Sequence, residues 1–155
     1  MTLELAGLDL GDGATVDALV ALQRASYGVE AELIGVAELP PMRETPEQLR
    51  ASGETFLVAR RDGRLVGAVG YARDGDVVDI HRLVVDPAAF RGGIATALLD
   101  ALEARERDAA RWTVGTGAAN APARALYERR GFAVADELVV GDGIRYVRLD
   151  RPGGE

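Results

Sequence analysis

The sequence contains no cysteine and no lysine. Without cysteine there can be no disulfide bond, no thiolate metal site and no cysteine nucleophile. Without lysine there can be no nucleotide-binding P-loop, because the GxxxxGK[ST] pattern needs that side chain on the phosphates. No uninterrupted apolar run approaches the roughly 18 residues of a membrane span, and the first residues, MTLELAGLDLGDG, carry acid rather than base. We therefore expect no membrane span and no secretory signal, and a cytoplasmic location.

All 18 basic residues are arginines, and the net charge is −7. A general nucleic-acid binder normally shows a basic surplus, so this balance disfavours that class. It favours cationic partners instead, amines included. The 155 residues, 48% of them hydrophobic, suit a single domain over residues 1–155 with one sizeable core. The tail RPGGE, residues 151–155, is expected to be frayed.

The first third of the chain predicts one strand and two helices. The alternating segment TLELAGLDL is typical of a half-buried strand. The segment GATVDALVALQRASYG has helical spacing of its apolar residues and is expected to stop at Gly28. Residues 29–52 are less regular and are expected to form a variable segment over the core. Within them TPEQLRAS predicts a short helix with Thr45 as N-cap and Pro46 at its first position.

The remainder predicts a mixed sheet with two more helices. Residues 54–86 read as three antiparallel strands joined by Asp-Gly turns. A helix begins near Gly93, RWTVGTG forms a strand, NAPARALYERR a helix that stops at Gly131, and FAVADELVV with IRYVRLD a last hairpin. This order indicates an α/β fold around one sheet, with a parallel pair where a helix connects two strands.

The segment RGGIAT, residues 91–96, lies where a strand gives way to a helix. A helix N-terminus offers unpaired N–H groups and a positive dipole end, and glycines let an anion approach the backbone. The spacing does not fit the GxGxxG fingerprint of dinucleotide-binding folds. The segment alone is therefore equally consistent with a plain turn before a helix and with a phosphate site.

A second motif, NAPARALYERRGF, begins at Asn120, the only asparagine of the chain. Tyr127 follows seven residues later, so two helical turns bring it to the same face. Taken singly these residues have structural explanations, because Asn is a common N-cap and Gly131 a typical C-cap. Together, about 25 residues after the glycine segment, the two motifs form a specific pattern.

These two motifs resemble those of the GCN5-related N-acetyltransferase (GNAT) family. LVVDPAAFRGGIATALL is similar to that family's pyrophosphate-binding segment Q/R-x-x-G-x-G/A, and NAPARALYERRGF to its N-x-x-A-x-x-L-Y-x-x-x-G-F segment. Phe90 stands where the first pattern has Gln or Arg, and Arg91 follows it. The resemblance implies a mostly antiparallel sheet splayed at a parallel strand pair, with helices on both faces.

The same resemblance implies acetyl-CoA as co-substrate and no metal. It places the pyrophosphate on the backbone amides of residues 91–96. It places the pantetheine arm along the backbone of residues 83–85, like an added strand. Asn120 is implied to hydrogen-bond near the pantetheine, whereas Arg124 is expected to be a solvated helix charge rather than a phosphate ligand. The implied cofactor-binding residues are Leu83, Val84, Val85, Arg91, Gly92, Gly93, Ile94, Ala95, Thr96 and Asn120.

The implied reaction is direct transfer of acetyl to a primary amine of a small molecule or peptide. A phenol, with a reference pKa of about 10, is protonated at neutral pH, so Tyr127 is the candidate general acid for the departing thiolate. Several family members carry a Glu five residues before the Asn, where this chain has Gly115. His81 is a possible base, since a regular strand places it on one face with Leu83 and Val85. Asp79, a water chain or an already neutral amine are alternatives, and the base stays unassigned.

The absence of a Glu at position 115 leaves a second hypothesis, in which the chain binds acyl-CoA as a sensor or interaction module without catalysis. Nothing in the sequence identifies the amine. Similar proteins are often dimers, so a homodimer is a possible assembly.

Overall fold

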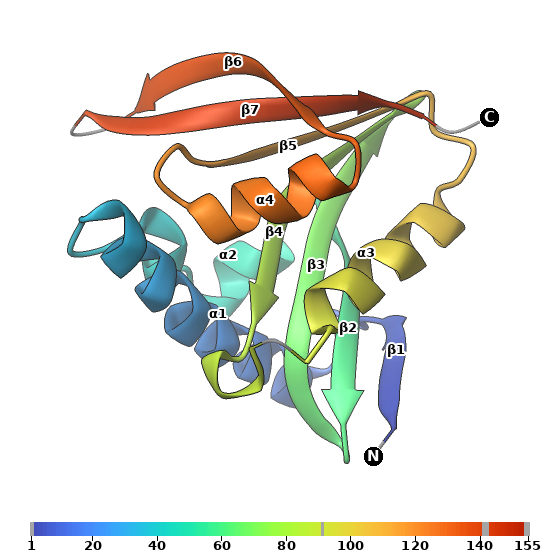
Figure 1. Cartoon of the computed structure of the whole chain (residues 1–155). Coiled ribbons are helices and arrows are strands. Elements are labelled where there is room, and N and C mark those ends of the chain that lie inside the picture. The colour runs from blue at the N-terminus through green and yellow to red at the C-terminus, as the bar shows by residue number, and fades with distance from the viewer. Residues whose placement is uncertain (1, 91, 141–142, 154–155) are drawn as a thin grey trace.

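The structure is a computed structural model that describes residues 2–90, 92–140 and 143–153. Seven strands form one sheet, with helices on both of its faces (Figure 1). The strands are β1 (Leu3–Gly7), β2 (Thr55–Arg61), β3 (Arg64–Asp74), β4 (Val77–Val85), β5 (Arg111–Gly117), β6 (Ala133–Val140) and β7 (Ile144–Pro152). The helices are α1 (Gly13–Ile34), α2 (Pro46–Arg50), α3 (Ile94–Arg105) and α4 (Ala121–Arg129), with short 3₁₀ turns η1 (Pro40–Arg43) and η2 (Pro87–Ala89). Among the described residues, no helix is long and apolar enough to cross a membrane.

The strand order is β1-β2-β3-β4-β5-β7-β6. Neighbouring strands are antiparallel except β4 and β5, which are parallel and are connected through α3. This confirms the mixed α/β sheet with one parallel pair that the element order predicts. The Asp-Gly turns between β2, β3 and β4 are also where the sequence places them, with Asp62 and Gly63 at φ 53° and 78° and Gly75 at φ 60°.

The parallel pair separates part-way along its length. Residues 77–80 of β4 pair with residues 111–114 of β5, but β4 continues to Val85 and β5 to Gly117 beyond these pairs. The other edge of β5 pairs with β7 along its whole length, from Arg111 to Gly117. The sheet therefore opens between the C-terminal halves of β4 and β5, as the family resemblance implies.

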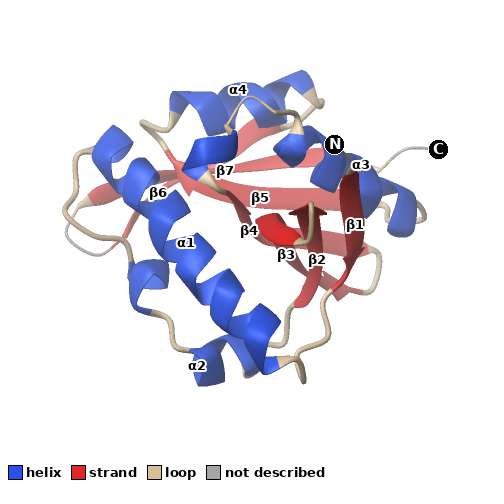
Figure 2. Cartoon of the chain, turned by 90° about the horizontal axis from the view of Figure 1, so that it is seen from below, coloured by secondary structure: helices blue, strands red, loops and turns tan. Residues whose placement is uncertain are grey.

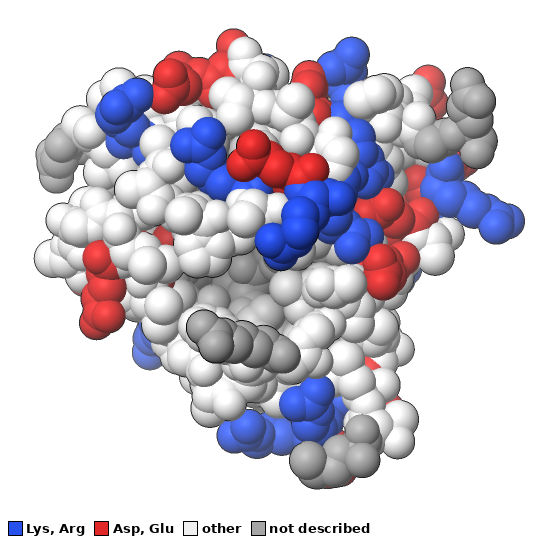
Figure 3. Space-filling view, viewed as in Figure 1, with Lys and Arg blue, Asp and Glu red and all other residues white. Residues whose placement is uncertain are grey.

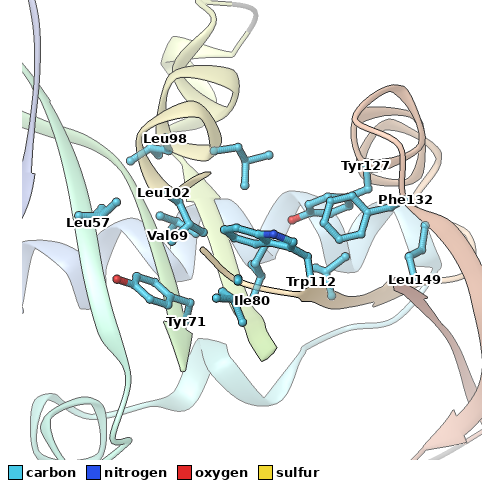
Figure 4. Packing of buried hydrophobic residues seen from close by; sticks show 14 of the residues in the cluster. Leu57, Val69, Tyr71, Ile80, Leu98, Leu102, Trp112, Tyr127, Phe132 and Leu149 are labelled. Atoms are coloured by element: carbon cyan, nitrogen blue, oxygen red, sulfur yellow. The ribbon is translucent and has the colours of Figure 1, made fainter. Parts of the chain in front are cut away.

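Two clusters of buried side chains lie on opposite faces of the sheet. The cluster under α3 and α4 includes Trp112, which lies among Ile80, Leu102 and the Tyr127–Phe132 pair (Figure 4). The other cluster packs the apolar side of α1, and Leu49 of α2, against β2 and β3. Seen from below, α1 and α2 lie on one side of the strands and α3 and α4 on the other (Figure 2).

Helix α1 is longer than the sequence predicts. It does not stop at Gly28 but continues to Ile34 and ends at Gly35, which adopts φ 80°. An interior glycine costs a helix only about 1 kcal/mol relative to alanine, and the residues that follow, VEAELI, include strong helix formers. The expectation of an irregular segment from residue 29 is therefore wrong for residues 29–34. The short helix capped by Thr45 is confirmed, since the Thr45 hydroxyl accepts a hydrogen bond from Gln48 N.

The C-terminal tail is also more ordered than expected. Arg151 and Pro152 belong to β7 and pair with Trp112 and Arg111 of β5. The guanidinium of Arg151 lies 5.4 Å from the centroid of the Trp112 ring and 5.0 Å from that of Phe132. These contacts hold the end of β7 against the core, so the expected fraying of residues 151–155 is wrong for its first two residues. Residues 154–155 lie outside the described part of the chain.

Candidate active site

Helix α3 begins directly after the glycine segment. Gly93 is its N-cap with φ 76°, a left-handed conformation that favours glycine. Ile94 is buried and fixes the first turn against the sheet. Gly92 and Gly93 are exposed, so the unpaired N–H groups of this helix end face solvent. The expectation for Arg91 falls outside the described residues.

A cavity of about 590 Å³ lies between α1, β4, the residues around Gly93 and α4. It appears as the hollow in the middle of the face shown in Figure 3. Most of the residues that the motifs single out contribute to its wall, whereas Val84 and Gly92 do not. Those on the wall are Leu83, Val85, Gly93, Ile94, Ala95, Thr96 and Asn120.

The position of Val84 follows from the pairing of β3 and β4. Asp86 N donates to Val66 O, which makes this a hydrogen-bonded pair. Such pairs alternate along an antiparallel ladder, so the Val84 peptide groups face β3 while those of Leu83 and Val85 face the opening between β4 and β5. The Val84 side chain is fully buried in the α1-side core. Of the three strand residues expected to contact the cofactor, Leu83 and Val85 direct their peptide groups into this opening and Val84 does not.

A second, smaller cavity of about 180 Å³ lies on the other side of the opening between β4 and β5. Glu30, Leu83, Asn120, Ala123 and Leu126 line both cavities, so the two meet at these residues. Titratable side chains from four elements line the smaller cavity. These are Tyr27 and Glu30 of α1, His81 and Arg82 of β4, Tyr127 of α4 and Tyr146 of β7.

Tyr127 lines the smaller cavity and is 4% exposed. Its ring packs edge-on against Phe132, with ring centroids 5.5 Å apart (Figure 4). Burial raises the pKa of the Tyr127 hydroxyl above its usual value of 10, and the nearby carboxylate of Glu30 raises it further. The phenol therefore stays protonated at neutral and mildly alkaline pH.

His81 does not lie on the face that a regular strand predicts. The register of β3 against β4 shifts between Gly70 and Tyr71, which pair with Arg82 and Ile80, so His81 is the extra residue of a β-bulge. Its ring is 38% exposed, with Nε2 3.0 Å from Asp79 Oδ2 and Nδ1 3.8 Å from Glu54 Oε2. Leu83 and Val85 instead pack against the α3 side of the sheet. The expected shared face is wrong, although His81 still reaches the smaller cavity.

Glu30 is a site residue that sequence reasoning missed. Its Oε1 accepts a hydrogen bond from Asn120 Nδ2 at 3.1 Å and lies 3.5 Å from Thr116 Oγ1. Because α1 was expected to stop at Gly28, residue 30 had no place in the predicted helix. The signal was present in the spacing, since Ser26, Tyr27 and Glu30 share one face of a longer helix.

Asn120 has a structural role as well. Its Oδ1 accepts a hydrogen bond from Ala123 N at 3.2 Å, which makes it the N-cap of α4. Both polar atoms of its amide are therefore hydrogen-bonded, Oδ1 to the start of α4 and Nδ2 to Glu30. Arg124, one turn later, donates to Ala118 O at 3.1 Å.

Arg82 lies beneath the smaller cavity with its side chain only 9% exposed. It donates to Glu54 Oε1 at 2.8 Å and, through Nη1, to Gln23 Oε1 at 2.6 Å, and it also pairs with Glu44. Its guanidinium further lies 5.4 Å from the centroid of the Phe56 ring. Two carboxylates and an amide thus occupy its donors, and its positive charge is compensated.

A family model described as Acetyltransferase (GNAT) family matches residues 17–132. This range includes the residues that line the larger cavity and, apart from Tyr146, those that line the smaller one. The chain belongs to the GNAT family. The fold of this chain is also similar to those of solved N-acetyltransferases whose sequence identity to it is low. The PaiA N-acetyltransferase of Thermoplasma acidophilum, solved in complex with coenzyme A, has a TM-score of 0.79 at 17% identity, over 98% of this chain and 99% of that one. The ribosomal-protein-S18-alanine N-acetyltransferase of Escherichia coli has a TM-score of 0.78 at 18% identity, over 97% and 94%.

Two curated proteins are similar in sequence to this GNAT chain. The UPF0157 protein YqkA of Bacillus subtilis (strain 168) is 35% identical over 126 residues, which is 81% of this chain and 37% of that protein. The IAA acetyltransferase of Azospirillum brasilense is 38% identical over 82 residues, or 50% of this chain and 54% of that protein. The chain therefore spans about half or less of the length of these curated relatives.

Proposed function

We propose that this GNAT protein is an acetyl-CoA-dependent N-acetyltransferase that moves an acetyl group directly to a primary amine of a small molecule or peptide. The observation that carries the proposal is the meeting of two cavities at Leu83 and Asn120, one open to the N-terminus of α3 and the other lined by Tyr127. Direct transfer requires the two substrates to be held in adjacent sites whose reacting groups meet, and two cavities that share lining residues provide such sites. The names of the two solved N-acetyltransferases with the same fold support transfer to nitrogen.

In this proposal the larger cavity holds acetyl-CoA. The pyrophosphate contacts the amides at the start of α3, where Gly92 and Gly93 leave the backbone accessible. Two arginines stand close enough to add positive charge. Arg61 has guanidinium nitrogens 3.6 Å from where a Cβ on Gly92 would lie, and Arg129 lines the cavity.

The pantetheine arm follows the backbone of Leu83 and Val85, whose peptide groups face the opening in the sheet. In the described structure the Val85 N–H donates to Ser26 Oγ at 3.3 Å. The Ser26 hydroxyl thus marks a position where a hydrogen-bonding group of the arm fits against β4. The arm would act as an added strand in the gap that β5 leaves.

The thioester then lies where the two cavities meet. The amine nitrogen attacks the thioester carbonyl, and the Leu83 N–H stabilises the developing negative charge on the carbonyl oxygen. As the C–S bond breaks, Tyr127 donates its hydroxyl proton to the thiolate. The raised pKa of Tyr127 keeps this proton available through the whole neutral range.

A thiol-release assay with acetyl-CoA and a panel of amines tests the function. We expect stoichiometric release of CoA thiol and formation of an N-acetyl product by mass spectrometry with at least one primary amine. Calorimetry with CoA alone runs beside it. CoA binding with no turnover on any amine would overturn the enzymatic proposal in favour of a binding module, and no CoA binding would overturn both.

A further inference from the structure

We propose that Glu30 binds the ammonium group of the acceptor amine and accepts its proton before the amine attacks. The inference rests on the proposed N-acetyltransferase function and adds the residue and the acceptor charge that this function leaves open. It is carried by the position of one carboxylate at the junction of the two cavities, among three phenols.

Glu30 lies at the junction of the two cavities. Glu30 lines both cavities, and so do Leu83 and Asn120, which border the place proposed for the thioester. A base for an incoming amine must reach the nitrogen within hydrogen-bond distance or through one water. His81 lines only the smaller cavity and has its Nε2 engaged by Asp79 at 3.0 Å.

The Glu30 carboxylate is held in place by hydrogen bonds that do not neutralise it. Asn120 and Thr116 hold Oε1 through neutral donors, and within the described ranges of the chain Glu30 forms no ion pair. The cation of the smaller cavity, Arg82, is already compensated by Glu44 and Glu54. The cavity therefore presents a net negative charge, which an ammonium group would offset.

Three tyrosines line the smaller cavity together with Glu30. Aromatic faces attract cations, and phenols from three elements stand around Glu30. Burial raises the pKa of Tyr27, Tyr127 and Tyr146, and in each the Glu30 carboxylate adds to the shift, so its charge is felt by all three hydroxyls. The titratable and charged groups that face Glu30 across the cavity are Tyr27, His81, Arg82, Tyr127 and Tyr146.

The same arrangement selects against acceptors with a carboxylate next to the amine. Such an acceptor needs a free cation, and the donors of Arg82 are taken by Glu44, Glu54 and Gln23. A carboxylate in this cavity would face Glu30 instead. The acceptor class is therefore a small primary amine that enters as a cation without an adjacent carboxylate.

Each proton of the proposed reaction has a defined donor and acceptor. The ammonium gives one proton to Glu30 and becomes a neutral amine, whose nitrogen forms the new C–N bond. The C–S bond breaks, and sulfur takes the proton of the Tyr127 hydroxyl. The second proton that nitrogen loses in becoming an amide restores Tyr127, and Glu30 returns its proton to solvent. The products are the N-acetyl amide, CoA thiol and one released proton.

The test compares Glu30→Gln with Glu32→Gln, which removes the same charge from an exposed position of the same helix. Glutamine keeps an oxygen that can accept from Asn120, so the shape of the junction is retained. We expect kcat/KM for an alkylamine to fall about 10²–10⁴-fold in Glu30→Gln, with the Kd for CoA within twofold of wild type. Glu32→Gln is expected to match wild type in both.

The pH profile separates a base from a merely structural carboxylate. We expect wild type to lose activity on the acidic side, and we expect Glu30→Gln to lose that limb and to gain activity only as the amine deprotonates in solution. A profile in which His81→Gln, rather than Glu30→Gln, removes the acidic limb would overturn the proposal. So would a Glu30→Gln variant that is folded, as judged by urea unfolding, and as active as wild type.

The acceptor class is tested with an alkylamine and the α-amino acid of the same carbon skeleton. We expect wild type to prefer the alkylamine by at least about tenfold, and equal or reversed preference would contradict the inference. Wild-type protein that acetylates no amine at all would overturn the proposed function itself. Turnover by wild type that Glu30→Gln leaves unchanged would overturn only the role of Glu30.

Discussion

The amide of Asn120 joins two helices that are far apart in the sequence: its Oδ1 caps α4 through Ala123 N, and its Nδ2 donates to Glu30 of α1 at 3.1 Å. One side chain thus fixes both the start of the helix that carries Tyr127 and the carboxylate at the junction of the cavities. Stability and site geometry depend on the same residue.

Asn120→Ala removes both hydrogen bonds, whereas Asn120→Ser keeps a side-chain oxygen for the cap. Replacing a good N-cap by alanine costs about 0.5–2 kcal/mol, and serine is about as good a cap as asparagine. We expect urea unfolding to show this loss in Asn120→Ala and most of the stability to return in Asn120→Ser. An Asn120→Ser protein no more stable than Asn120→Ala would contradict the capping role.

Tyr127→Phe removes only the hydroxyl from the proposed general acid. General acid catalysis is worth about 10²–10⁴ in rate, so we expect kcat to fall by that factor while the Kd for CoA stays within twofold. Tyr71→Phe is the matched control, because the Tyr71 hydroxyl is bonded to Glu106 at 3.0 Å, away from both cavities. A steady-state thiol-release assay measures turnover by both variants. Unchanged turnover in Tyr127→Phe would show that Tyr127 is not the general acid.

Tyr127 also predicts how stability depends on alkaline pH. Its pKa in the folded protein is raised by burial above the value of about 10 expected in the unfolded chain. The folded state therefore holds its proton more tightly, and the associated stability is present below pH 10 and is lost as the pH rises toward the folded pKa. Between pH 8 and pH 11 we expect the unfolding free energy of wild type to fall by about 1.4 kcal/mol more than that of Tyr127→Phe. Parallel unfolding curves of the two proteins at both values check this, and an unchanged difference would mean that Tyr127 ionises freely in the folded state.

The sequence predicts the order of the elements well because local signals determine them. The Asp-Gly turns, Thr45 and Asn120 as caps, and the left-handed Gly93 each act within a few residues of the chain. The parallel pair follows from the helix between two strands. These features need no knowledge of distant contacts.

The differences arise where a local signal is weak or where distant contacts decide. Gly28 costs a helix only about 1 kcal/mol, which is too little to end it, and residues 29–34 continue α1 until the left-handed Gly35. The bulge at His81 depends on the register of β3 against β4, which no local pattern encodes. Arg82 meets Glu44, Glu54 and Gln23 only in the folded chain, so this cluster could not be assigned to the site beforehand, whereas Glu30 was missed only because α1 was expected to stop at Gly28.

The Arg82 cluster is expected to be costly to break. Arg82→Leu would leave Glu44 and Glu54 without their cation at a mostly buried site, and removing one partner of a buried ion pair costs about 3–5 kcal/mol. Arg145→Leu serves as the control, because Arg145 and Glu137 form an exposed pair with side chains 66% and 58% accessible. Exposed pairs contribute only about 0–1 kcal/mol. Equal effects of the two substitutions on urea unfolding would show that the cluster is not held as tightly as its geometry indicates.

Gly67 of β3 sets how closely α3 approaches the sheet. A Cβ at this position would lie 2.7 Å from Ile94 Cγ2, 3.1 Å from Leu98 Cδ1 and 3.3 Å from Val84 O. Ile94 and Leu98 are the first buried residues of α3, so Gly67→Ala must displace the end of the helix that carries the proposed pyrophosphate amides.

We expect Gly67→Ala to lose about 1–3 kcal/mol of unfolding free energy, the usual cost of overpacking a core, and to bind CoA more weakly in calorimetry. Gly115→Ala is the matched control for stability, because the nearest atom to its added Cβ is Val147 O at an ordinary 3.8 Å. Since both glycines lie in strands, the same gain in chain stiffness applies to each, and only the contact with α3 differs. A Gly67→Ala protein as stable as Gly115→Ala, with unchanged affinity for CoA, would show that α3 can shift without disturbing the glycine segment at its start.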